Sequence, residues 1–126
     1  MTLDQICVTK EWAEKLKKAR YPQRDSAFCW YFNHEAEVVH LVHNSEDQNG
    51  VICAAPTASE ILEKLPSREF NKNGYLTFCK GIADYRVYWT SQNSGIWIAD
   101  FNDLLLPNAL AKMYCYLVQE NLIIKD

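Results

Sequence analysis

The chain has 126 residues, of which 48% are hydrophobic and 23% charged, and its formal net charge is -3 at pH 7. This length and composition fit one soluble globular domain over residues 1–126 and argue against two. A net charge this small gives no electrostatic reason to expect nucleic acid or an anionic membrane as a partner.

No apolar stretch approaches the roughly 20 residues needed to span a bilayer. The N-terminus lacks the basic region and apolar run of a signal peptide. We therefore expect a cytoplasmic protein with no membrane association.

In chain order, the first predicted element is a helix over about residues 9–20, which Thr9 can cap and in which apolar residues recur at helical spacing. Two strands follow at 27–33 and 38–42, because both segments are short and rich in aromatic or β-branched residues. They are joined as a hairpin, and a short strand is expected at 51–54.

The clearest motif in the chain is the start of a helix at Thr57. Thr57 and Glu60, three residues later, form a capping box, in which each side chain bonds the other residue's backbone N–H. Pro66 ends the helix. The apolar residues of this helix fall on one stripe: Ala58, Ile61, Leu62 and Leu65. A helix this short depends on packing, so we interpret the motif as structural rather than chemical.

After this helix the pattern predicts three strands, at 75–80, 85–90 and 95–100, in an antiparallel meander. The longest helix begins near 103–107 and continues to about 121, with its proline in the opening turn, where a missing N–H is tolerated. The order α-β-β-(β)-α-β-β-β-α indicates an α+β fold. We expect a mainly antiparallel sheet of about five strands with three helices packed on one face.

Three motifs occur in order along the chain. They are residues 55–66 around the capping box, Asn73-Gly74-Tyr75-Leu76, and Asn108-Ala109-Leu110-Ala111-Lys112-Met113 leading to Glu120-Asn121-Leu122-Ile123. Together, over roughly residues 50–124, they resemble small uncharacterised proteins encoded by bacteriophages and prophages, notably of gut bacteria. That family has no assigned activity. The resemblance therefore implies a phage or prophage origin and a compact fold, and it brings no catalytic residue with it.

Five cysteines are spread along the chain without a CxxC pair: Cys7, Cys29, Cys53, Cys79 and Cys115. An odd number at wide spacing indicates reduced, buried thiols rather than disulfides or a zinc site. Cys53 is the best placed for a nucleophile because it precedes the capped helix, near the positive end of the helix dipole. Its apolar neighbours favour a buried and inert thiol instead.

The possible metal ligands concentrate at His34, Glu35, Glu37, His40 and His43. Because His40 and His43 lie three apart on a predicted strand, they point to opposite faces, and we predict no metal site. Gly-rich phosphate loops, GxSxG and HExxH are all absent from the sequence. No catalytic residue and no cofactor is nominated, and nothing in the sequence indicates an enzyme.

The remaining candidates for function are aromatic residues on the strands. Because strand side chains alternate, we expect Tyr31, Arg86, Tyr88 and Trp97 to share the sheet face opposite the core. Cross-strand packing alone explains many such aromatics, but Tyr, Trp and Arg are also enriched at interface hot spots. We therefore predict a non-enzymatic module that binds a host or phage protein, or self-associates as a homodimer.

The alternative is a nucleic-acid-binding accessory protein. The same sheet aromatics would then stack single-stranded bases, helped by the basic side of the first helix. The acidic net charge favours contact with protein.

Overall fold

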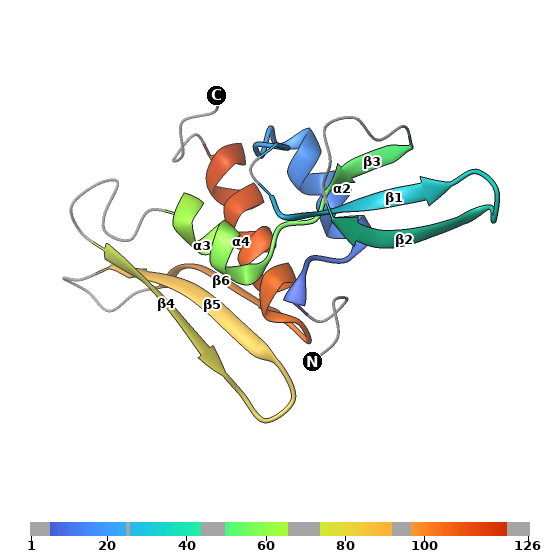
Figure 1. The fold of residues 1–126 in the computed structure, drawn as a ribbon. Coiled ribbons are helices and arrows are strands. Elements are labelled where there is room, and N and C mark those ends of the chain that lie inside the picture. The colour runs from blue at the N-terminus through green and yellow to red at the C-terminus, as the bar shows by residue number, and fades with distance from the viewer. Residues whose placement is uncertain (1–5, 25, 44–49, 66–73, 92–96, 121–126) are drawn as a thin grey trace.

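The computed structural model describes residues 6–24, 26–43, 50–65, 74–91 and 97–120, apart from the side chains at 74, 75, 78, 90, 91, 97 and 98. The elements in this part of the chain are α2 (Lys10–Lys18), β1 (Phe28–Asn33), β2 (Val38–His43), β3 (Val51–Ala54), α3 (Ala58–Lys64), β4 (Gly74–Lys80), β5 (Tyr85–Ser91), β6 (Trp97–Asp103) and α4 (Leu106–Gln119) (Figure 1). This confirms the predicted α+β class and the predicted order of elements. No helix within the described ranges has both the length and the apolar character needed to cross a membrane.

The strands divide into two sheets. Within the described residues each sheet has three antiparallel strands, in the orders β2-β1-β3 and β4-β5-β6. The predicted antiparallel pairing is present, but the strands do not form one continuous sheet. The reason is visible in Figure 1, where α3 and α4 lie between the two sheets and separate them.

Helix α4 is the centre of the core. It contacts α2, α3, β5 and β6, and most of its residues are buried, so its wide apolar surface is covered on several sides. Pro107 lies in its first turn, as predicted. A single cluster of buried side chains joins α4 to Trp89 and Val87 of the second sheet and to Cys53 of the first.

Helix α3 begins with the predicted capping box. Thr57 Oγ1 accepts a hydrogen bond from the Glu60 N–H at 3.3 Å, and Glu60 Oε1 accepts one from the Thr57 N–H at 2.8 Å. Glu60 Oε2 also accepts from the Ala27 N–H at 3.0 Å, which ties the residue before β1 to this helix. Ile61 is fully buried, so the helix is held by packing, as expected for its length. The predicted stop residue, Pro66, lies outside the described residues.

Candidate functional site

The four residues predicted to form one binding face do not share a sheet. Tyr31 lies in β1 of the first sheet, whereas Arg86 and Tyr88 lie in β5 of the second. Trp97 is the first residue of β6, where its backbone pairs with Thr90, and its side chain lies outside the described part. The expectation of one shared face is therefore wrong, because it assumed a single sheet.

Arg86 is engaged within its own sheet. Its Nε and Nη2 donate to Asp100 Oδ1 and Oδ2 at 2.9 and 2.6 Å, and its guanidinium lies 5.5 Å from the centre of the Tyr88 ring. A bidentate pair of this kind neutralises the guanidinium and fixes its direction. The guanidinium beside Tyr88 is thus already paired with a carboxylate, which does not favour base stacking beside phosphate.

Each of the two strand histidines packs against an aromatic ring of β1. His40 stacks on Tyr31 with ring centroids 5.7 Å apart, and His43 packs against Phe28 at 5.1 Å. Since directly paired residues share a face, the register confirms that His40 and His43 point to opposite sides of the sheet. In the ranges that the structure describes, no group of three or more His, Cys, Asp or Glu side chains could hold a metal ion.

Cys53 is not an activated nucleophile. It is 2% exposed, and burial, followed by the nearby Glu14, raises the pKa of its thiol to about 11. Burial likewise raises the pKa of Cys7 to about 12 and that of Cys115 to about 11. A reactive cysteine needs a lowered pKa and access to solvent, so these thiols fit the predicted inert interior role.

The buried thiols predict a loss of stability at alkaline pH. Because their pKa values are raised in the folded state, they contribute stability that is complete below the unfolded-state pKa and is lost as pH rises through the folded-state value. Urea denaturation should therefore show the free energy of unfolding falling as pH rises above about 9. Cys53→Ala should make this fall shallower, whereas Cys79→Ala, at an exposed thiol, should leave it unchanged. Equal profiles for the two variants would contradict this assignment.

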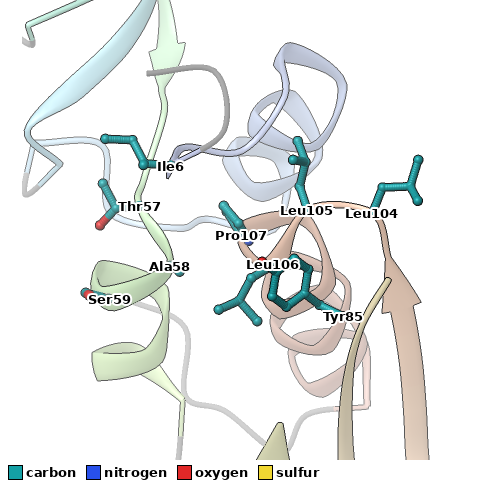
Figure 2. A pocket seen from close by; sticks show the side chains of 9 residues that line it. All are labelled: Ile6, Thr57, Ala58, Ser59, Tyr85, Leu104, Leu105, Leu106 and Pro107. Carbon is teal, nitrogen blue, oxygen red and sulfur yellow. The ribbon is translucent and has the colours of Figure 1, made fainter. Parts of the chain in front are cut away.

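One large cavity lies between the start of α3 and the entrance to α4 (Figure 2). Its volume is about 570 Å³, and it is lined by Ile6, residues 57–59, Tyr85 and residues 104–107. The polar side chains among these residues are the hydroxyls of Thr57, Ser59 and Tyr85, and Thr57 Oγ1 already accepts the capping hydrogen bond. Among the described lining residues there is no carboxylate, amine, imidazole or thiol, and the Tyr85 phenol is the remaining group with an ionisable proton. The sequence signal for this cavity is the run Leu104-Leu105-Leu106-Pro107, which sequence reasoning did not connect to it.

The hydrogen bonds of β1 show which of its residues direct their backbone N–H and C=O groups toward β3 and which toward β2. The Phe32 N–H donates to the Gly50 carbonyl and the Phe28 carbonyl accepts from the Ala55 N–H, both at 2.9 Å. Gly50 and Ala55 flank β3, so the backbone groups of Phe28 and Phe32 point toward β3. In an antiparallel strand, the backbone groups of successive residues point to opposite neighbours, so those of Cys29 and Tyr31 point toward β2.

The same alternation leaves part of β2 directed toward open space. His40 pairs with Tyr31, whose backbone groups point toward β2, so the backbone N–H and C=O of His40 point toward β1. The backbone N–H and C=O of Val39 and Leu41 therefore point the other way. Because β2 is an outer strand of its sheet, no strand of the described part of the chain lies on that side. At the end of β2 the His43 carbonyl turns inward and lies 4.0 Å from Cys29 Sγ. Among the described residues, the open backbone groups are thus the N–H and C=O of Val39 and Leu41, together with the N–H of His43.

In the described part of the chain, two other outer strands have backbone groups capped by side chains, and β2 does not. On β3, Lys17 Nζ donates to the Ile52 carbonyl and Gln23 Oε1 accepts from the Ala54 N–H, both at 2.8 Å. On β6, Lys112 Nζ donates to the Asn102 carbonyl at 2.7 Å. Among the described residues, no side chain bonds the open backbone groups of β2.

The side chains of β2 leave this edge unprotected. Its sequence, Val-Val-His-Leu-Val-His, contains no Lys, Arg, Asp, Glu, Pro or Gly, the residues that usually prevent an edge from pairing. Val38 and Val39 are 47% and 39% exposed, and both histidines are exposed. Figure 1 shows the β1–β2 hairpin extending away from the helices, with β2 on its outer side. We call the open backbone of β2 and these side chains the β2 edge.

Of the four residues predicted for binding, Tyr31 lies beside the β2 edge, through its stack on His40. Sequence reasoning missed the edge itself, although the uncharged β-branched run was visible in the sequence. Compared with known proteins, the chain matches no family model, no curated protein and no solved structure.

Proposed function

We propose that this chain is a non-enzymatic protein-binding module that binds an extended segment of its partner by adding a strand at the β2 edge. The observation that carries the proposal is the open backbone of Val39 and Leu41 on an uncharged outer strand. In strand addition, main-chain hydrogen bonds supply affinity and alternate side chains supply specificity. The exposed Val38 and Val39 would give the partner apolar contacts on both faces of the strand.

A peptide-display selection tests this proposal. Random 12-residue peptides are selected on the immobilised protein, and the enriched peptides are then titrated against the wild type, Val39→Lys and Val51→Lys. The two variants are matched, because Val39 and Val51 are 39% and 37% exposed on the two outer strands of the same sheet. A lysine on an edge strand opposes pairing there, so Val39→Lys should weaken peptide binding by about tenfold or more.

Val51→Lys should leave peptide binding within about twofold, because β3 already has its backbone capped. Equal binding by the wild type and both variants would remove the β2 edge as the binding site. Both variants should keep the wild-type circular dichroism spectrum, which separates loss of binding from loss of fold.

Nucleic-acid binding is the second candidate function. It draws on the exposed lysines of α2, among which Lys15 pairs with Glu11 at 3.3 Å and Lys17 donates to the Ile52 carbonyl. These bonds, and the pairing of Arg86 with Asp100, reduce the free positive charge available to phosphate. Retention on single-stranded DNA that falls steeply with salt would favour this candidate, and we expect none at about 50 mM salt.

The origin and location of the protein remain part of the proposal. The ordered motifs support a phage or prophage source, and a host or phage protein is then the natural class of partner. A cytoplasmic location fits the cysteines, because reduced thiols persist in that compartment.

A further inference from the structure

We infer that the partner is a second copy of this chain, whose β2 pairs antiparallel with the first across a two-fold axis at His40. This inference rests on the proposed function, since it uses the same edge. The β2-β1-β3 sheet of one copy would join the same sheet of the other copy. The result would be one sheet of about six strands, in the order β3-β1-β2-β2-β1-β3.

The backbone selects this register. A two-fold axis at His40 places Val39 opposite Leu41 of the second copy, and Leu41 opposite Val39. Both residues direct their N–H and C=O groups outward, so each of these two pairs exchanges two hydrogen bonds, about four in all. A register centred on Leu41 would instead pair Val39 with His43, whose carbonyl is turned toward Cys29 Sγ. The His40 register therefore uses the outward N–H and C=O groups of both Val39 and Leu41.

The side chains fit the same register. Val39 meets Leu41 on the face that carries Phe28, and Val38 meets Val42 on the face that carries Tyr31. Glu37, the exposed residue before β2, comes next to His43 of the second copy, which gives complementary polarity at both ends of the pairing. Since β2 contains no Lys, Arg, Asp or Glu, this register sets none of these charged side chains opposite another along the strand.

The association is expected to be weak. An edge of six residues buries less than the roughly 1,200 Å² of a stable interface, so monomer and dimer should exchange. With so little buried area, the main-chain hydrogen bonds of Val39 and Leu41 have to supply much of the affinity.

Sedimentation velocity at about pH 8, over roughly 5 to 500 µM protein, tests the inference. The wild type and Val51→Lys should show a sedimentation coefficient that rises with concentration, and Val39→Lys should remain monomeric. A wild type that is monomeric throughout would overturn the inference. If the selected peptides still bound the wild type and not Val39→Lys, the proposed function would survive this failure; if Val39→Lys bound them equally, it would fail as well.

Disulfide trapping tests the register. In a Cys79→Ser background, His40→Cys would place two thiols on the axis with Cα atoms about 4.5 Å apart, within the range that a disulfide spans. Leu41→Cys would place them diagonally, about 7 to 8 Å apart and beyond that range. Mild oxidation should therefore yield a covalent dimer from His40→Cys and little from Leu41→Cys. The reverse result would overturn the His40 register, and no covalent dimer from either variant would overturn the pairing.

Discussion

Replacing Trp89 with alanine is expected to lower the free energy of unfolding by about 3 to 5 kcal/mol, the largest effect that we predict for one substitution. Trp89 is fully buried, and its side chain is the largest among the fully buried residues of the described chain. It lies on β5, the central strand of the second sheet, and belongs to the core cluster that includes α4. Truncation would leave a cavity between the sheet and the helix, where both surfaces are too constrained to collapse around it.

Urea denaturation followed by far-ultraviolet circular dichroism measures this change. Tyr88→Ala is the matched control, because Tyr88 is the neighbouring aromatic on the opposite face of the same strand and is only half-buried. It should cost about 1 kcal/mol. Losses of the same size for the two variants would contradict the assignment of the β5 face that packs on α4.

Asn108→Leu should lower the free energy of unfolding by about 1 to 3 kcal/mol, although the leucine side chain has the same branched shape and number of heavy atoms. Asn108 is 5% exposed, and its Oδ1 accepts from the Thr9 N–H at 3.0 Å while its Nδ2 donates to Asp103 Oδ1 at 3.4 Å. Asp103 Oδ2 also pairs with Lys112 at 3.0 Å. The network thus joins the N-cap of α2 to the first turn of α4, and leucine would leave the Thr9 N–H without its partner.

The control for Asn108→Leu is the same substitution at Asn102. Asn102 is exposed and donates to Asp84 Oδ2 at 3.0 Å, so its loss should change the free energy of unfolding by no more than about 0.5 kcal/mol. Thermal denaturation of the two variants side by side measures the difference. An Asn108→Leu protein as stable as Asn102→Leu would mean that the buried network does not contribute to stability.

Local features of the fold were predictable from the sequence because they depend on neighbouring residues. The capping box of Thr57 and Glu60 involves residues three apart, and the structure contains both of its hydrogen bonds. The strand at Val51–Ala54 and the proline in the first turn of α4 were likewise predictable from a few consecutive residues. The buried state of Cys53 followed from its apolar neighbours.

The division into two sheets and the location of the site were not predictable in the same way. Whether β1 pairs with β2 and β3 or with a later strand depends on where α4, the last helix, packs, and alternation within a strand contains no such information. For that reason Tyr31 was grouped with Arg86 and Tyr88, which lie in the other sheet. The open edge of β2 has the same origin, because a strand is an edge only with respect to its neighbours.

Site-resolved amide hydrogen exchange along β2 tests the central claim, that this chain binds by strand addition at the β2 edge, most directly. In dilute protein, the outward amides of Val39 and Leu41 should exchange much faster than those of His40 and Val42, which face β1. With a selected peptide at saturation, or at high protein concentration, Val39 and Leu41 should become protected while His40 and Val42 change little. Binding that left the Val39 and Leu41 amides in fast exchange would contradict the claim.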